Sequence, residues 1–175
     1  MIRKFSPDDG RDLFEYLSQA EVVKFEPYDV FTEAAARQEA ARRADDDSFW
    51  AVCLKSGGKL IGNLYLSEGD FDTWELGYVF NSRYQGAGYA TEAARAMLDD
   101  VFANHGARRV VAMCNPLNGP SWRLLERLGL RREGHLRQNI YFKKDASGEP
   151  IWLDTYEYGL LASEWFGGRD DPAEK

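Results

Sequence analysis

The sequence has few cysteines and no long apolar segment, and these absences exclude several classes of protein. Only Cys53 and Cys114 occur among 175 residues, too few for the disulfide framework of a small secreted domain. No run approaches the roughly 18 apolar residues of a membrane-spanning helix. Residues 1–5 contain no apolar stretch long enough for a secretion signal. The sequence therefore predicts a cytoplasmic protein that does not enter the membrane.

Positive charge is also scarce. The chain has 22 lysine and arginine residues against 29 aspartate and glutamate residues, a formal net charge of −7. This excess of negative charge disfavours a nucleic-acid-binding surface, and no basic stripe with interleaved aromatic residues is present. It suits a cationic amine as ligand, whereas an anionic ligand would depend on local amides and a few arginines. We expect neither a nucleic-acid partner nor a metal site.

Length and hydrophobic periodicity predict one domain of alternating strands and helices. A chain of 175 residues with 44% hydrophobic residues can bury a substantial core. Helices are predicted to begin near the capping residues Ser6, Thr32 and Asn118, and after the glycine pair before Tyr89. We expect a domain over residues 1–166 and a polar C-terminal tail over residues 167–175. Strands are predicted at residues 2–5, 48–54, 60–66, 74–80, 107–114, 132–141 and 151–161.

Residues 74–95 (W-E-L-G-Y-V-F-N-S-R-Y-Q-G-A-G-Y-A-T-E-A-A-R) are predicted to form a strand, a tight glycine loop and the start of a helix. Gly86 and Gly88 allow backbone dihedral angles that other residues avoid. A glycine turn before a helix directs unpaired N–H groups and the positive end of the helix dipole at one point, which is a phosphate receptor. An ordinary strand-to-helix connection is the alternative. The spacing matches neither a Rossmann loop, which needs a third glycine, nor a P-loop, which needs Gly-Lys-Ser/Thr.

The segment Gln85-Gly86-Ala87-Gly88-Tyr89-Ala90 resembles the acyl-coenzyme-A loop of the GNAT N-acetyltransferases, whose pattern is Gln/Arg-x-x-Gly-x-Gly/Ala. The wider run E-L-G-Y-V-F…Y-Q-G-A-G-Y-A-T-E-A is similar to the RimJ/RimL-type branch, which acetylates the N-termini of ribosomal proteins. Residues 115–134 (N-P-L-N-G-P-S-W-R-L-L-E-R-L-G-L-R-R-E-G) extend the resemblance in the expected order. Together these motifs cover nearly the whole second half of the chain.

The resemblance implies the α/β GNAT fold, a single domain with a mixed, mostly antiparallel sheet of about seven strands and flanking helices. In that fold a parallel strand pair splays apart, and the pantetheine arm of acetyl-CoA lies in the gap. The implied activity is transfer of the acetyl group to a primary amine, on a peptide N-terminus or a small molecule, by direct attack in a ternary complex. The implied partner is this amine acceptor, and a homodimer is compatible with the resemblance.

The resemblance also implies a set of cofactor-binding residues. The end of the central strand would offer backbone groups to pantetheine, and the glycine loop would bind the phosphates. Arg83 could reach the phosphates, although an ordinary surface charge is an equal alternative. The residues predicted in this way to bind the cofactor are Val79, Phe80, Asn81, Arg83, Gln85, Gly86, Ala87, Gly88, Tyr89, Ala90, Thr91, Asn118 and Ser121.

Acetyl transfer requires a neutral amine, so a carboxylate is a reasonable general base. Glu75 on the central strand is the first candidate, and a structural ion pair is the alternative role for it. Glu133 is the second candidate, because the connection after Gly129 would return it to the cleft. Where many GNAT members carry a tyrosine for the leaving thiolate, this chain has Leu125. The resemblance therefore assigns that role to Ser121, whose alternative is a structural hydroxyl at the helix start.

The missing tyrosine leaves a second hypothesis open, in which the domain binds acyl-CoA as a sensor without catalysis. Acceptor selection is expected in residues 21–31, the second helix and the final hairpin, where no motif identifies the amine. Tyr28, Phe31, Tyr141 and Trp152 could form walls of the acceptor pocket, or equally belong to the core.

Overall fold

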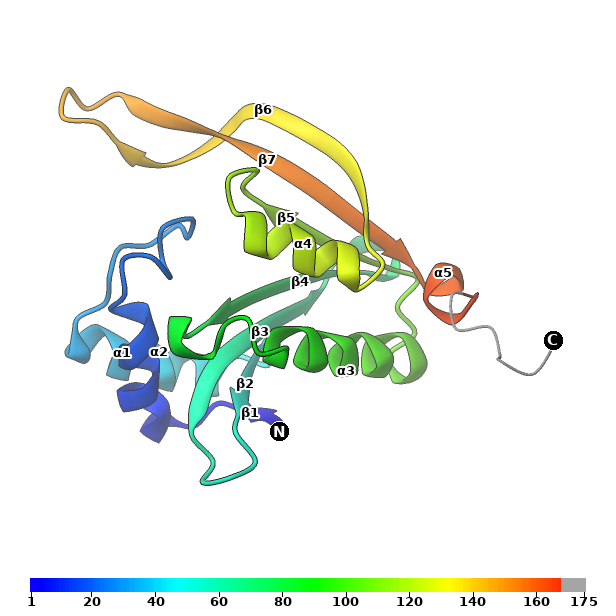
Figure 1. Cartoon of the computed structure of the whole chain (residues 1–175), viewed down its shortest axis with the longest axis horizontal. Helices are drawn as coiled ribbons and strands as arrows, with labels where there is room; N and C mark the ends of the chain where they lie inside the picture. Colours follow the sequence, from blue (N-terminus) through cyan, green and yellow to red (C-terminus); the bar gives the residue numbers. More distant parts are fainter. Residues whose placement is uncertain (168–175) are drawn as a thin grey trace.

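The computed structural model describes residues 1–167, which form one seven-stranded sheet with helices on both faces (Figure 1). The helices are α1 (Gly10–Leu17), α2 (Glu33–Ala44), α3 (Tyr89–Asn104), α4 (Gly119–Arg127) and α5 (Ala162–Gly167). The strands are β1 (Ile2–Lys4), β2 (Phe49–Cys53), β3 (Leu60–Glu68), β4 (Thr73–Phe80), β5 (Arg109–Cys114), β6 (Arg131–Lys144) and β7 (Pro150–Leu161). Short 3₁₀ turns occur at η1 (Pro7–Asp9), η2 (Asp70–Asp72) and η3 (Ser82–Tyr84).

The sheet is antiparallel except at its centre. Its strand order is β1-β2-β3-β4-β5-β7-β6, and within the described residues only β4 and β5 run parallel. These two strands pair over three positions, from Thr73 opposite Arg109 to Glu75 opposite Val111. Beyond these positions β4 pairs with β3 and β5 pairs with β7, so β4 and β5 separate. The predicted mixed sheet with a splayed parallel pair is therefore confirmed.

Two hydrophobic cores cover the two faces of the sheet. On one face, Leu98 of α3 and Leu125 of α4 share a core with Leu76 of β4. On the opposite face, Leu17 of α1 shares a core with Ala51 of β2. Successive side chains of a strand point to opposite faces, so the central strands contribute to both cores. Within residues 1–167, no helix combines the length and the apolar character needed to cross a membrane.

Side-chain caps fix the predicted starts of two helices. The Thr32 hydroxyl accepts a hydrogen bond from the N–H of Ala35 at 3.2 Å, which begins α2. The Asn118 side-chain oxygen accepts one from the N–H of Ser121 at 3.4 Å, which begins α4. Each cap satisfies one of the N–H groups that a helix start leaves unpaired. The sequence therefore predicts both starts correctly.

The strands β6 and β7 form a long arm that extends beyond the rest of the sheet (Figure 1). Both strands exceed their predicted bounds, because backbone pairing continues to Lys144 opposite Pro150. The register of β6 is irregular near Gln138, which has a φ of 48°. On the arm, Lys143 forms an ion pair with Asp29 in the loop between α1 and α2, with Nζ–Oδ1 at 2.7 Å. The arm and this loop therefore meet on one side of the molecule.

Residues 162–167 form helix α5, a segment for which the sequence predicted neither a helix nor a strand. The Glu164 carboxylate accepts a hydrogen bond from the N–H of Leu161 at 2.9 Å, just before the helix begins. Trp165 is buried, with its ring centroid 5.9 Å from that of Phe102. A helix this short gives no periodic signal in the sequence. The predicted tail lies outside the described residues except for Gly167, which ends α5.

Candidate active site

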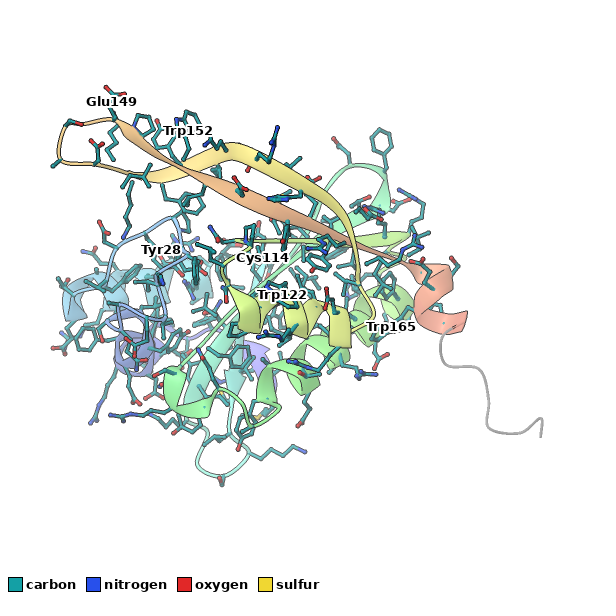
Figure 2. The ribbon with its side chains drawn as sticks, turned by 45° about the horizontal axis from the view of Figure 1, so that its top comes forward. Tyr28, Cys114, Trp122, Glu149, Trp152 and Trp165 are labelled. Carbon is teal, nitrogen blue, oxygen red and sulfur yellow. The ribbon has the colours of Figure 1, made fainter. Side chains whose placement is uncertain are left out.

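A cavity of about 930 Å³ opens where β4 and β5 separate. Its walls come from these two strands, the loop before α3 and the start of α4, and from the α1–α2 loop and α2. Cys114 at the end of β5 and Tyr28 in the α1–α2 loop both lie on these walls, below the β6–β7 arm in Figure 2. The cavity therefore joins the glycine loop to the segment in which acceptor selection is expected.

The loop before α3 has the conformation of a phosphate receptor. Gly86 (φ 75°) and Gly88 (φ 86°) lie in the left-handed region, and Gly88 is the N-cap of α3. Gln85 fixes the loop to β4, because its Nε2 donates to the carbonyl oxygen of Phe80 at 2.9 Å. In the part of the chain that the structure describes, the N–H groups of residues 86–91 have no backbone acceptor, and the N-cap supplies no side-chain acceptor.

Open space faces these unpaired donors. A Cβ atom built on Gly86 or Gly88 would meet no other atom within 4 Å. The donors converge at the N-terminus of a 16-residue helix, whose dipole adds partial positive charge. Free N–H groups, a helix N-terminus and open space together fit the pyrophosphate of coenzyme A.

Tyr78 of β4 reaches across the gap between the splayed strands to α4. Its hydroxyl donates to the carbonyl oxygen of Ser121 at 2.9 Å and lies 3.0 Å from Ser121 Oγ. Burial raises the pKa of Tyr78, so the phenol keeps its proton. Burial also raises the pKa of the nearby Cys114 thiol, to about 11. Tyr78 is not among the residues predicted for the site, because a tyrosine within an apolar strand resembles an ordinary core residue.

The walls of the cavity also carry carboxylates that form no salt bridge in the described part of the chain. Glu21, Glu26 and Glu75 line the cavity, and none of the three forms a salt bridge within residues 1–167. Burial raises the pKa of Glu26, while a hydrogen bond with Tyr28 and the charge of Arg43 act in the opposite direction. Glu26 is half-buried, so a cation bound beside it would offset part of the cost of burying its charge, whereas Glu21 and Glu75 are exposed.

Two of the arginines that line the cavity are already paired. Arg42 Nη2 lies 2.7 Å from Glu39 Oε1, and Arg43 Nε lies 2.7 Å from the same oxygen atom. Arg43 still lies close enough to act on Glu26, and Arg127 is a third arginine on the cavity wall. No group of three or more His, Cys, Asp or Glu side chains in the described chain is placed to hold a metal ion.

Most of the residues predicted from the sequence line this cavity, but three predicted cofactor residues do not. Asn81 is buried, and its Nδ2 donates to Glu15 at 3.0 Å, which ties the end of β4 to α1. Arg83 is exposed and forms an ion pair with the same Glu15 at 3.3 Å. Ala87 is exposed between the two loop glycines. The predicted residues that line the cavity are Glu75, Val79, Phe80, Gln85, Gly86, Gly88, Tyr89, Ala90, Thr91, Asn118 and Ser121.

Glu133 lies outside the cavity. Its carboxylate forms an ion pair with Arg109, with Nη1–Oε1 at 3.0 Å, and this arginine holds the pKa of Glu133 below its ordinary value. The strand that follows Gly129 pairs with β7 from Arg131 onward. The connection therefore leads away from the gap between β4 and β5. The structure corrects the expected position of Glu133.

One of the four aromatic residues considered for the acceptor pocket, Tyr28, lines the cavity. Phe31 packs edge-on against Tyr28, with ring centroids 5.3 Å apart. Tyr141 and Trp152 pack against each other on the arm, with ring centroids 5.3 Å apart, and Figure 2 shows Trp152 on this arm; neither residue lines the cavity. Phe142 lines the cavity in their place, because successive residues of a strand point to opposite faces.

Comparisons with known proteins agree with this geometry. The sequence profile described as Acetyltransferase (GNAT) domain matches residues 1–131. The uncharacterised N-acetyltransferase YnaD of Bacillus subtilis is 38% identical over 170 residues, which cover 94% of this chain and 95% of YnaD. The crystal structure of an acetyltransferase (GNAT family) from Bacillus anthracis matches with a TM-score of 0.84 and 35% identity, covering 93% of this chain and 95% of the other.

A more distant similarity supports the RimJ-type resemblance. The [ribosomal protein uS5]-alanine N-acetyltransferase of Escherichia coli is 31% identical over 101 residues, which cover 58% of this chain and 49% of that protein. The splayed strand pair and the glycine loop stand where the fold requires them. Fold, loop and sequence similarity together show that the chain belongs to the GNAT family of acetyltransferases.

Proposed function

We propose that this protein transfers the acetyl group of acetyl-CoA to a primary amine by direct attack in a ternary complex. One observation carries the proposal: a single cavity is lined both by the glycine loop with its free N–H groups and by carboxylates that form no salt bridge in the described residues. When bound, acetyl-CoA supplies the thioester to be cleaved. The residues of the chain bind and orient the two substrates and handle the proton.

Cofactor binding would use the glycine loop and the free edge of β4. The N–H groups of residues 86–91 would hold the pyrophosphate. Past the last position paired with β5, the edge of β4 that faces the gap has no strand partner. Its free backbone groups can bind the amides of the pantetheine arm in the way that one strand binds another. Asn118 and Ser121 form the opposite wall of the gap.

Glu75 is the group that we propose as general base. It occupies the last position at which β4 pairs with β5, and it lines the cavity. Leu76 points into the core beside α3 and α4, so Glu75 points to the opposite face of the sheet, toward α1 and α2. An alkyl amine with a pKa of about 10 arrives mostly protonated. Glu75 would accept its proton, directly or through water, so that the nitrogen can attack the thioester carbonyl.

Ser121 is the group that we propose to stabilise the sulfur as the carbon–sulfur bond breaks. It lies in the first turn of the nine-residue helix α4, where the helix dipole favours a thiolate. Cys114 lies close by, but its pKa of about 11 keeps it a thiol at neutral pH. A thiol is a weak nucleophile compared with a thiolate, which supports direct transfer over an acetylated cysteine.

The acceptor that fits best is a primary amine that arrives as a cation. The carboxylates Glu21, Glu26 and Glu75 on the cavity wall support this assignment, as does the net charge of −7. The Escherichia coli relative is named for an alanine of ribosomal protein uS5. A peptide N-terminus and a small-molecule amine both meet the requirement.

A thiol-release assay with acetyl-CoA and a panel of N-terminal peptides, polyamines and aminoglycosides tests the proposal. Turnover with one class of amine, weakened in Glu75→Gln and Ser121→Ala, is the expected result. Binding of CoA in calorimetry without turnover on any amine would contradict catalysis and favour the sensor hypothesis. Turnover that both variants retain in full would contradict the two proposed roles.

A further inference from the structure

The hydrogen bonds of Tyr78 control where the Ser121 hydroxyl can point. The phenol has one proton, and two oxygen atoms of Ser121 lie within reach, the carbonyl at 2.9 Å and Oγ at 3.0 Å. A carbonyl oxygen only accepts. When Tyr78 donates to that carbonyl, the Oγ contact is a hydrogen bond only if Ser121 donates to Tyr78. In this state the serine proton is used by Tyr78 and is not available to a ligand in the gap.

A second state of the same pair releases the serine proton from Tyr78. If the phenol rotates its proton to Oγ, the Ser121 hydroxyl no longer donates to Tyr78 and can donate to a ligand in the gap or to its other neighbour, Cys114. The Ser121 carbonyl still has a donor, because α-helix geometry directs the N–H of Leu125 to it. No buried acceptor is left unsatisfied, so the rotation costs little free energy.

We propose that Tyr78 is a positioning residue, which aims the Ser121 hydroxyl at the sulfur of the acetyl thioester. This inference rests on the proposed function. Tyr78 donates to Ser121, and Ser121 donates to the sulfur as it becomes negative. Consecutive hydrogen bonds of this kind polarise one another, so Ser121 binds the departing thiolate more tightly than it would alone. Coenzyme A leaves as the thiolate, and the second proton of the amine nitrogen passes to solvent water as the amide forms, so Tyr78 transfers no proton.

The surroundings of Tyr78 agree with a donor that keeps its proton. The ionisable neighbours that act on it are Cys114, Arg127 and Tyr158. Burial raises the pKa of Cys114 to about 11 and that of Tyr158 to about 12, so both are neutral at physiological pH. Arg127 is the cation among them. Since no neighbour gains or loses charge near pH 7, the hydrogen-bonded pair works in one protonation state.

The test compares two tyrosines that both bind α4, the half-buried Tyr78 and the buried Tyr158. Tyr78→Phe removes the hydroxyl that faces the gap. Tyr158→Phe is the matched control, because the Tyr158 hydroxyl donates to Glu126 of α4 at 3.1 Å and lies outside the cavity. Both variants are measured for thiol release, for CoA binding by calorimetry and for thermal unfolding. The double variant Tyr78→Phe/Ser121→Ala completes the set with the single variant Ser121→Ala.

We expect Tyr78→Phe to lower kcat about tenfold, with KM for acetyl-CoA and CoA affinity within about twofold of wild type. The shape of the pH profile should not change. In the Ser121→Ala background, Tyr78→Phe should have no further effect, and Tyr158→Phe should keep wild-type kcat. CoA binding by Tyr78→Phe also establishes that this variant is folded.

Three results would overturn the inference. One is full kcat in Tyr78→Phe. Another is a loss of kcat on replacing Tyr78 by phenylalanine that is equally large with Ser121 and with Ser121→Ala. The third is a loss of kcat in Tyr158→Phe as large as the loss in Tyr78→Phe. Absence of turnover in the wild type would contradict the proposed function and the inference with it, whereas wild-type turnover with full activity in Tyr78→Phe contradicts the inference alone.

Discussion

Replacing Gly86 by alanine tests the glycine loop against a matched control elsewhere in the chain. Gly86 has a φ of 75°, and Gly57 in the turn between β2 and β3 has a φ of 79°. A Cβ atom at either position meets no other atom of the protein within 4 Å. The two substitutions therefore impose the same backbone strain and create no clash. They differ in position, since Gly86 lines the cavity and Gly57 does not.

The expected magnitudes follow from this match. A left-handed conformation costs a residue other than glycine about 1–2 kcal/mol, so both variants should lose about that much stability. Relief of the strain in Gly86→Ala would turn the loop N–H groups away from the phosphates, and the added methyl group occupies the open space. A hydrogen bond to a charged group contributes about 1.5–3 kcal/mol. Loss of one such bond raises the Kd for CoA about 10- to 100-fold.

Calorimetric titration with CoA, together with thermal unfolding of both variants, measures both effects. We expect similar losses of stability in Gly86→Ala and Gly57→Ala, and weaker CoA binding in Gly86→Ala alone. Gly86→Glu, which places a negative charge against the phosphates, should abolish binding. Wild-type affinity in Gly86→Ala would refute the assignment of this loop to phosphate binding. An equal loss of affinity in Gly57→Ala would show that strain alone explains the effect.

Three further predictions concern single side chains. Glu75→Gln should lower kcat/KM at neutral pH at least about 100-fold without changing CoA affinity, and steady-state kinetics with calorimetry checks both. Cys114→Ala should retain activity within about threefold, and mass spectrometry of the wild-type enzyme with acetyl-CoA should find no acetylated cysteine; an acetyl adduct on Cys114 would contradict direct transfer. Arg109 depresses the pKa of Glu133 in the folded state. The ion pair therefore stabilises the fold fully at pH values above the pKa that Glu133 has in the unfolded chain. This stabilisation is lost as the pH falls through the lower pKa that Glu133 has in the folded protein. Glu133→Gln should therefore cost under about 1 kcal/mol at neutral pH, with a difference from wild type that closes in acid and with kcat unchanged; a large loss of kcat would return Glu133 to the site.

Local signals predicted the central part of the fold and most residues of the cavity wall. Thr32 and Asn118 mark helix starts because their side chains satisfy specific N–H groups. Gly86 and Gly88 stand where the chain needs a left-handed backbone before α3. Each of these features depends on residues that are close together in the chain, so it can be recognised from a short stretch of sequence. The splayed strand pair came from family resemblance, because no local pattern encodes the separation of two strands.

Residues whose role depends on distant contacts could not be placed in this way. Tyr78 bonds Ser121 from a distant strand. Glu133 follows a glycine that ends α4, but the pairing of β6 with β7 turns it toward Arg109. Glu26 lies in a loop without periodicity, and its burial depends on how the loop folds over the cavity. In each case the deciding contact joins elements far apart in the sequence.

The most direct test of the central claim is an initial-rate experiment in which acetyl-CoA and an accepted amine are varied together, with the product identified by mass spectrometry. Direct transfer in a ternary complex predicts an acetylated amine and double-reciprocal plots that intersect. Parallel plots would indicate a covalent acetyl-enzyme and contradict the direct attack that we propose. Binding of CoA without any acetylated amine would contradict catalysis at this cleft altogether.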